Sequence, residues 1–259
     1  MAKPILEESI DAFNFYEYDL FRPETLMLAL PDLGLVGAIA GLHLVRELKM
    51  RDVVGIDSYQ ALPPVAVIIE GKPKHPIRIY GSQDGRLGVV LSDVPLAPPA
   101  AIAFSVAIVK YARSRGVRNI LSVTGLGNPS RYQFEKPNLY VLSNDEETAK
   151  KVSEITGAKQ VPGGVLVGPY AIVLKEASRQ GLVNTVLLVD SMVDIPDPEA
   201  SIVAVEAISK LYGYKVDTKK LEEEADKIKL RLKELMKETK SLMARMGKGY
   251  EYRPTLMYT

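Results

Sequence analysis

The sequence predicts an α/β fold in which a mixed, partly parallel sheet is flanked by helices. Val/Ile/Leu-rich runs of strand length alternate with segments of helical spacing over most of the chain. Pro and Gly clusters separate these segments, as turns between elements require. With 259 residues, 47% of them hydrophobic, the chain can bury a sizeable core. We therefore expect residues 1–215 to form an α/β core domain.

A strand, a turn and a helix open the predicted fold. The apolar run 25–30 leads into a turn at 31–34, and 35–48 has helical spacing with several small residues. Short connections follow at 71–76 and 81–86, which predict hairpins and hence a partly antiparallel sheet. The β-rich segments around them are 53–56, 65–70, 77–80 and 88–91.

The second half of the core repeats the alternation. Ser143 and Glu146 have the spacing of a capping box, which predicts the start of a helix running to about Ile155. Asp197 and Pro198 are a favourable N-cap and first helical residue for another helix. The expected strands are 119–123, 139–142 and 184–189, and the expected helices are 99–115, 143–155, 165–177 and 198–211.

A heptad-patterned helix with its hinge is expected at 216–249. Asp217 is its predicted N-cap and Gly247 its stop, so one continuous helix would be about 45 Å long. Apolar residues recur at alternating steps of four and three, which is typical of a helix that packs on another copy, although packing on the parent domain is the alternative. We predict self-association through this seam: Leu221, Ala225, Ile228, Leu232, Leu235, Thr239, Leu242 and Met246.

The last ten residues, 250–259, have no periodicity and are expected to form a flexible tail with a reach of about 35 Å. The chain ends in Met257, Tyr258 and Thr259, a hydrophobic-Tyr-any motif. The ionised α-carboxylate can pair with a lysine or with backbone amides, and a tyrosine ring can fill a slot and hydrogen-bond at its far end. These three residues therefore predict a tail that docks into a pocket of a partner protein.

Composition excludes several classes of function. A formal charge of +1 argues against nucleic acid or an acidic membrane as a partner reached by bulk electrostatics. Without cysteine there is no disulfide, thiolate nucleophile or zinc–thiolate site, and His43 and His75 have no companion at a recognisable spacing. We predict no catalysis, no metal and no cofactor. Acidic residues at 7, 8 and 11 replace the apolar segment of a signal peptide, which predicts a cytoplasmic protein, and the abundance of Lys, Glu and Arg suggests a thermophile.

Two patterns leave a ligand site open as an alternative. Glycines at 34, 37 and 41, at 125 and 127, and at 163 and 164 could line a cleft for a nucleoside-like or phosphorylated ligand, but close packing and tight turns explain them equally. Asp93, Asp190 and Asp194 follow predicted strands and could bind a cation or act as acid or base. Aspartates at such positions more commonly cap turns and helices.

Three motifs carry a resemblance to a known family: Pro31-Asp32-Leu33-Gly34-Leu35-Val36-Gly37, Thr124-Gly125-Leu126-Gly127 and Pro162-Gly163-Gly164. With them the chain resembles the archaeal proteasome assembly chaperones over about residues 25–211. The resemblance implies a nucleoside-phosphorylase-like core without the catalysis of those enzymes. It also implies a role as assembly chaperone or activator, and that Met257, Tyr258 and Thr259 dock between α subunits of the proteasome core particle. In that setting Thr259 would supply the carboxylate for a pocket lysine, Tyr258 the aromatic anchor and Met257 the apolar flank.

Overall fold

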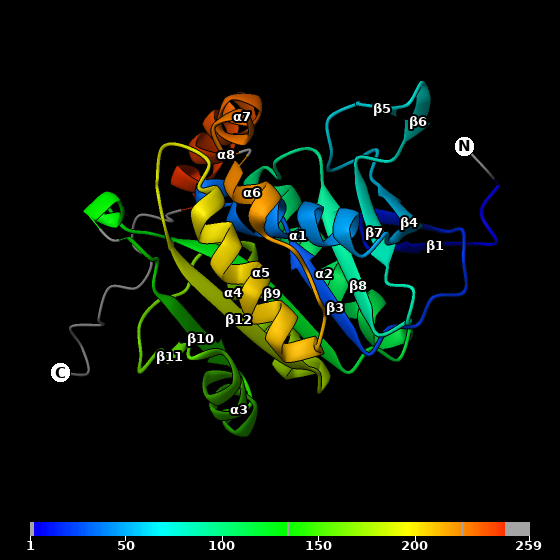
Figure 1. The fold of residues 1–259 in the computed structure, drawn as a ribbon. Helices are drawn as coiled ribbons and strands as arrows, with labels where there is room; N and C mark the ends of the chain where they lie inside the picture. Colours follow the sequence, from blue (N-terminus) through cyan, green and yellow to red (C-terminus); the bar gives the residue numbers. More distant parts are fainter. Residues whose placement is uncertain (1–2, 134, 224, 247–259) are drawn as a thin grey trace.

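The computed structural model describes residues 3–133, 135–223 and 225–246. Its main feature is a ten-stranded mixed sheet with the strand order β1-β2-β4-β7-β8-β3-β9-β12-β10-β11. Strands β5 and β6 form a separate two-stranded sheet. The predicted fold class, a mixed and partly parallel sheet flanked by helices, is confirmed (Figure 1).

The strands differ in length with their position. The two longest, β9 and β12, lie side by side, and the shortest strand of the main sheet, β11, lies at its edge. They are β1 (Leu6–Ile10), β2 (Phe13–Glu17), β3 (Thr25–Ala29), β4 (Arg51–Asp57), β5 (Val67–Ile69), β6 (Lys72–Lys74), β7 (Ile77–Gly81), β8 (Leu87–Ser92), β9 (Asn119–Gly127), β10 (Leu139–Ser143), β11 (Lys159–Gln160) and β12 (Val183–Ser191).

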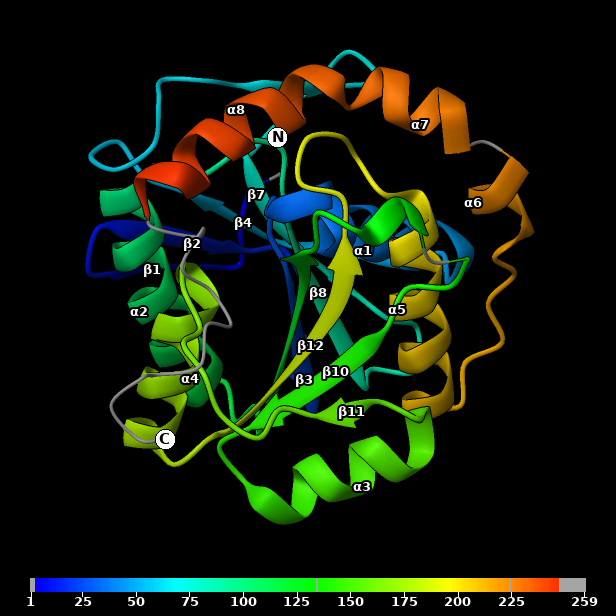
Figure 2. The same ribbon diagram turned by 90° about the vertical axis from the view of Figure 1, so that its left-hand side faces the viewer.

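Helices cover both faces of the sheet. Helices α1 and α5 contact each other on one face, α2 and α4 contact each other on the opposite face, and α3 lies beside β10 (Figure 2). The bounds are η1 (Leu33–Leu35), α1 (Val36–Glu47), α2 (Pro98–Ser114), η2 (Arg131–Gln133), α3 (Glu146–Thr156), α4 (Pro169–Gln180), α5 (Pro198–Tyr212), α6 (Lys219–Glu223), α7 (Ala225–Arg231) and α8 (Lys233–Arg245).

The parallel centre of the sheet determines where a site can form. Strands β8, β3, β9 and β12 run parallel to one another, whereas β1, β2, β4, β7 and β8 are joined by antiparallel pairs. The carboxyl ends of β3, β9 and β12 therefore meet at one edge of the sheet. That edge is where open α/β sheets usually bind ligands.

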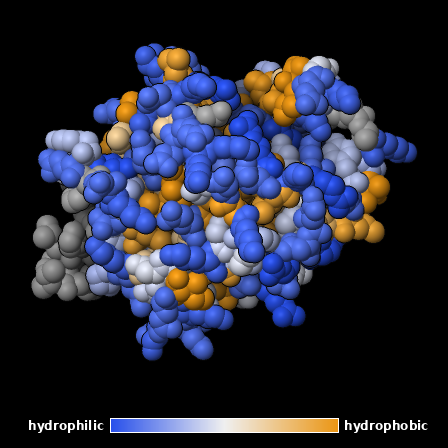
Figure 3. Space-filling view, viewed as in Figure 1, coloured by the Kyte–Doolittle hydropathy of each residue, from blue (hydrophilic) through white to orange (hydrophobic). Residues whose placement is uncertain are grey.

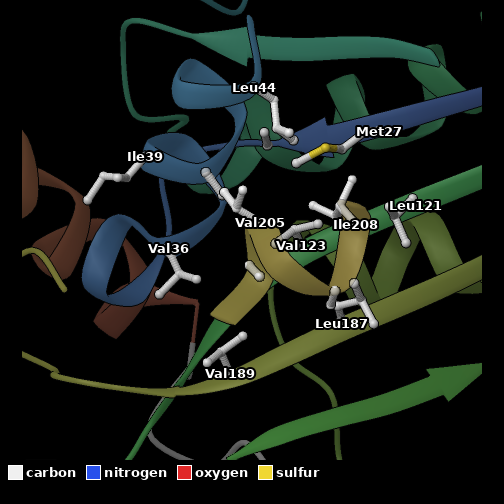
Figure 4. Close-up of a cluster of buried hydrophobic side chains, with 14 of the residues drawn as sticks. Met27, Val36, Ile39, Leu44, Leu121, Val123, Leu187, Val189, Val205 and Ile208 are labelled. Carbon is white, nitrogen blue, oxygen red and sulfur yellow. The ribbon is translucent and has the colours of Figure 1, made fainter. Parts of the chain in front are cut away.

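Alternating side chains of the central strands build two cores. In β3, Met27 and Ala29 face α1 and α5, while Leu26 and Leu28 face α2 and α4. Figure 4 shows the first core, in which Met27, Val123 and Val189 from the strands meet Ile208 from α5. Because these strands are buried on both faces, they are near-continuous apolar runs in the sequence, and this explains why the sequence predicts them well.

Two local predictions are wrong, and one element was not predicted. Residues 6–17 form the β1–β2 hairpin, which has no counterpart among the predicted elements. The cap of α3 is Asp145, whose side chain accepts a hydrogen bond from the Thr148 amide, and Ser143 lies in β10. The helix expected from Val165 begins only at Pro169. Asp197, by contrast, caps α5 as predicted, accepting from the Ala200 amide at 2.9 Å.

A buried carboxylate fastens the β1–β2 hairpin to the domain. Glu17 is fully buried and accepts hydrogen bonds from Tyr111 at 2.8 Å and from Arg115 at 2.5 Å. Burial by itself raises the pKa of Glu17, but the hydrogen bonds from Arg115, Tyr111 and Arg22 outweigh it, so the pKa lies below its ordinary value. Phe13 and Phe15 are buried beside this network, against Phe104 and Tyr111.

In the part of the chain that the structure describes, no helix combines the length and the apolar character needed to cross a membrane.

Candidate functional site

The segment after α5 forms a C-terminal arm, which we define as α6, α7 and α8. Helices α6 and α7 contact α5, and α8 passes over η1 at the carboxyl edge of the sheet and reaches α2 (Figure 2). Within the described residues of the arm, the helix is interrupted at Leu232, which separates α7 from α8. The described part of the arm is therefore not one uninterrupted helix, and it packs on its own domain, the alternative that the heptad pattern left open.

The apolar side of the arm faces the chain's own core. Met236 and Thr239 have no exposed surface and Met243 has 2%. The predicted seam residues Ile228, Leu232 and Leu235 are partly buried in the same contact, and Leu221 is buried. The structure gives the first four of the predicted self-association residues a contact within the chain. No second copy is present to test the role, so it stays a prediction for Leu221, Ile228, Leu232, Leu235 and Leu242.

The spacing of the heptad explains why the sequence missed the two methionines. Starting at Leu232, the series Met236, Thr239, Met243 advances in steps of four, three and four. The predicted series Leu235, Thr239, Leu242 advances from the same residue in steps of three, four and three. Both series share Leu232 and Thr239. Together they form a stripe wider than a coiled-coil seam, which is typical of a helix that covers a globular core.

Polar contacts hold the arm in place along its length. His43 Nε2 lies 2.7 Å from the Asp217 carbonyl oxygen, just before α6. Lys229 pairs with Glu199 at 2.9 Å, and Lys240 pairs with Asp194. Burial by itself raises the pKa of Glu199, but the hydrogen bond and charge of Lys229 outweigh it and lower the pKa.

Close packing accounts for the glycines at the carboxyl edge. Gly34 has a left-handed backbone (φ 61°), and a Cβ there would overlap the Ser191 hydroxyl. A Cβ at Gly125 would overlap the Leu33 carbonyl oxygen, and one at Gly37 would overlap the Val123 carbonyl oxygen. The absent side chains let η1 and α1 approach the strands directly, and these positions need no ligand to explain them.

The third glycine pair lies elsewhere. Gly163 and Gly164 line a hollow of about 330 Å³ whose other walls are apolar residues of β10, β12, α4 and the loop 161–166. Neither Gly34 nor Gly125 lines this hollow. The three glycine turns therefore do not form one cleft, and the hollow offers no charged side chain for a phosphate.

The acidic residues singled out by the sequence have structural partners. Asp93 pairs with Arg78 at 2.5 Å, Asp190 accepts a hydrogen bond from Asn138 at 2.7 Å, and Asp194 pairs with Lys240. Among the residues that the structure describes, no three His, Cys, Asp or Glu side chains are grouped as a metal site requires. His75 lies 3.0 Å from the Tyr18 hydroxyl and is stacked on Tyr16.

One buried ion pair supports the edge under the arm. Asp197 is fully buried, 3.2 Å from the guanidinium of Arg131, and also accepts from the Met192 amide at 3.0 Å. Burial raises the pKa of Asp197, although the backbone hydrogen bonds and Arg131 oppose the shift. The Asp197 amide donates to the Gly34 carbonyl at 2.8 Å, which ties α5 to η1.

The geometry thus gives the carboxyl edge a structural use. In this chain η1 and α8 lie at the carboxyl edge, where many α/β proteins have an open cleft. The arm ends at Met246, which is partly buried against both cores. The predicted docking residues Met257, Tyr258 and Thr259 lie outside the described residues.

Comparison with known proteins decides the family. The PAC2 family profile matches residues 26–236, which include most of the core domain and the first part of α8. The chain belongs to the PAC2 family. All three motifs that carried the resemblance lie within the matched range, and the resemblance to the archaeal proteasome assembly chaperones is confirmed.

Solved structures and a sequence relative are also similar to this PAC2 protein. Pyrococcus furiosus PbaA, an archaeal homolog of proteasome-assembly chaperone, is 29% identical, with a TM-score of 0.81 over 90% of this chain and 99% of PbaA. Pyrococcus furiosus PbaB, an archaeal proteasome activator, shares the fold at 21% identity, with a TM-score of 0.72 over 87% of this chain and 99% of PbaB. An uncharacterized protein of Methanocaldococcus jannaschii is 24% identical over 93% of this chain and 98% of its own length.

Proposed function

We propose that this PAC2 protein is a proteasome assembly chaperone or activator that docks its C-terminal tail into pockets of the proteasome α ring. The observation that carries the proposal is the hydrophobic-Tyr-any ending, Met257, Tyr258 and Thr259, on a chain 29% identical to a homolog of proteasome-assembly chaperone. The fold alone would not be sufficient, because one fold serves many functions.

The position of the arm supports a tail that leaves the domain at one defined point. Ion pairs from Lys229 and Lys240 and the buried Met236 and Met243 hold α7 and α8 against the core. Thirteen residues follow Met246, enough for a reach of about 45 Å when extended. A tail attached to a helix that is packed on the core can reach different positions on a ring surface while the domain stays folded.

In this proposal each terminal residue has its own role. The Thr259 α-carboxylate pairs with a lysine of the pocket, the Tyr258 ring fills the slot, and Met257 packs beside it. Several copies of the chain would present several tails to a ring of repeated pockets, so that weak single contacts would combine through a high effective concentration. The partners are then the α subunits of the core particle and further copies of this chain.

The decisive experiment measures binding of the purified chain to an archaeal α ring and to the complete core particle. We expect deletion of residues 257–259 to abolish binding and Tyr258→Ala to weaken it by about 30-fold or more, the loss typical of a buried aromatic anchor. Tyr252→Ala is the matched control, because it removes the same side chain from the same tail outside the motif. Unchanged affinity after the deletion would contradict the proposal.

Two further measurements separate chaperone from activator and test the carboxylate. A chaperone accelerates ring formation from α subunits, whereas an activator raises peptide hydrolysis by the finished core particle. Adding one alanine after Thr259 moves the carboxylate without removing a side chain, and we expect it to weaken binding. Binding should also weaken with rising salt, because the carboxylate–lysine contact is screened.

A further inference from the structure

The outer side of the arm borders an open groove with a volume of about 600 Å³. One wall is the loop that follows β12, with Ile195 and Pro196, and the other wall is formed by α7 and α8. Four lysines of these helices line the groove, at positions 229, 233, 237 and 240. In Figure 3 the surface over α7 and α8 is mainly hydrophilic, with hydrophobic side chains between. The groove therefore combines positive charge with apolar surface.

The arm carries more positive charge than the rest of the chain. Residues 225–245, which include α7 and α8, contain seven Lys and Arg and three Asp and Glu, a formal charge of +4. The whole chain has +1, so the remaining residues together carry −3. A charge separated in this way attracts negatively charged groups to the arm, although the protein is nearly neutral.

Two of the four lysines have no partner for their charge. Lys229 pairs with Glu199 and Lys240 with Asp194, at the two ends of the row. Lys233 and Lys237, between them, are exposed and form no ion pair with any other residue that the structure describes. Like charges four residues apart destabilise a helix. An external negative charge would relieve the repulsion between these two lysines.

Exposed apolar side chains lie in the same groove. Leu230 of α7 is 76% exposed, and Ile195 of the opposite wall is 43% exposed. The apolar stripe of the arm that faces the core does not cover Leu230, because this residue lies on the groove side of α7. A hydrophobic side chain placed in the groove would remove apolar surface of both residues from water, which favours binding.

We propose that this groove binds an extended acidic peptide segment in which a hydrophobic residue is followed or preceded by two carboxylates. In an extended segment, residues two positions apart lie about 6.6 Å from each other on the same side. Side chains one helical turn apart, such as Lys233 and Lys237, are separated by a similar about 6 Å. Acidic residues at alternate positions can therefore face both lysines together, while the next alternate residue, an apolar one, packs on Leu230.

Other occupants match the groove less well. A second copy that presented the same face would bring lysines against lysines. The chain's own segment 247–259 contains two basic side chains and one acidic side chain, so it does not supply the negative charge. A nucleic acid would match the lysines, but single strands bind mainly by stacking on aromatic side chains, and the described lining of the groove holds none. Leu230 and Ile195 instead favour a peptide with an apolar side chain.

The inference does not rest on docking of the C-terminal tail. All lining residues of the groove precede Met246, whereas the terminal motif is residues 257–259. A chain that lacks residues 257–259 should therefore bind an acidic peptide as the full chain does. Conversely, α-ring binding by a variant with a disabled groove would leave the proposed function standing.

The first test measures binding of a fluorescent peptide, Glu-Ser-Glu-Ser-Leu-Ser-Glu-Ser-Glu, to the full chain by fluorescence anisotropy at low salt. The peptide reads the same in both directions, so it tests either orientation in the groove. We expect saturable binding with a Kd below about 1 mM. A peptide with Gln in place of every Glu should bind about 10-fold more weakly or worse. Absence of saturable binding, or equal binding of the Gln peptide, would overturn the proposal.

The second test changes the lysines that lack a partner. We expect the double variant Lys233→Glu/Lys237→Glu to weaken peptide binding by about 10-fold or more, since it reverses both charges. The matched control is Lys150→Glu/Lys151→Glu, which makes the same change at two exposed lysines of α3. Circular dichroism checks that all variants are folded. Equal losses in the two double variants would mean that only the net charge of the chain matters, and would overturn the proposal.

The third test concerns the apolar part of the groove and the class of partner. Leu230→Ser keeps the charge and should weaken binding by about 5-fold, whereas Leu20→Ser, at a leucine that is 75% exposed elsewhere, should not change it. A single-stranded DNA with four phosphates is the competing probe. Tighter binding of this DNA through Lys233 and Lys237, or unchanged peptide binding by Leu230→Ser, would overturn the assignment of the groove to an acidic peptide with a hydrophobic residue.

Discussion

The C-terminal arm and the β5–β6 hairpin lie at the same edge of the sheet and differ in what covers their apolar residues. The arm turns Met236, Thr239 and Met243 into its own domain, where all three are buried. The hairpin leaves Ile68 exposed, as is Val65 just before it, although Lys74 at its root pairs with Asp52 of the main sheet. The difference indicates that the apolar stripe of the arm stabilises the fold, whereas the exposed apolar residues of the hairpin contribute little to its stability.

The largest difference between the two regions should appear in stability. We expect Met236→Ala to lower the free energy of unfolding by about 2–5 kcal/mol, because it leaves a cavity under a helix. Ile68→Ala in monomeric chains should change it by less than about 0.5 kcal/mol, as for other exposed sites. Denaturant titration at low protein concentration measures both. Equal losses of unfolding free energy in the two variants would contradict the distinction between the buried stripe of the arm and the exposed edge of the hairpin.

The close packing of η1 on the strands beneath the arm can be tested at Gly125. A methyl group there meets the Leu33 carbonyl oxygen, so Gly125→Ala should destabilise the protein by about 1–3 kcal/mol through overpacking under η1. Gly85→Ala is a control in open space, where only the left-handed backbone (φ 73°) adds strain. If Gly125→Ala were the better tolerated of the two, close packing would not explain this glycine.

The root of the hairpin should respond to pH. Burial lowers the pKa of His75 below its ordinary 6.5, although Asp57 opposes the shift. The unfolded chain therefore takes up a proton first, so the stability that neutral His75 contributes is present above pH 6.5 and is lost as the pH falls. Amide exchange of β5 and β6, corrected for its intrinsic pH dependence, should quicken between about pH 7.5 and pH 5.5. His75→Phe keeps a ring on Tyr16 and should remove this response.

The smallest effect is expected at the surface ion pairs of the arm. Lys240 and Asp194 are both substantially exposed, so Lys240→Ala should cost at most about 1 kcal/mol, and less in high salt. Thermal unfolding at two salt concentrations measures this. A larger, salt-independent loss would mean that the charged side of the arm, and not Met236 with Met243, holds it on the domain.

Particular elements show which parts of the fold could be predicted from the sequence. Strands β3, β9 and β12 are apolar on both faces, so composition alone identified them, and Asp197-Pro198 located the start of α5. The β1–β2 hairpin was missed because Glu7, Glu8 and Asp11 hide its alternation, and its order depends on the distant Tyr111 and Arg115. The capping box at Ser143 failed because Asp145 is a closer cap for the same helix.

The sequence by itself determined the α/β class, the family motifs, the heptad seam of the last helices and the hydrophobic-Tyr-any ending. Those features follow from residue type and spacing along one chain. Only the tertiary structure decided which surface the stripe covers, and which glycines serve packing at the carboxyl edge. A heptad of apolar residues gains nearly the same free energy from any apolar surface, so its partner is chosen by the surface that the rest of the fold leaves uncovered.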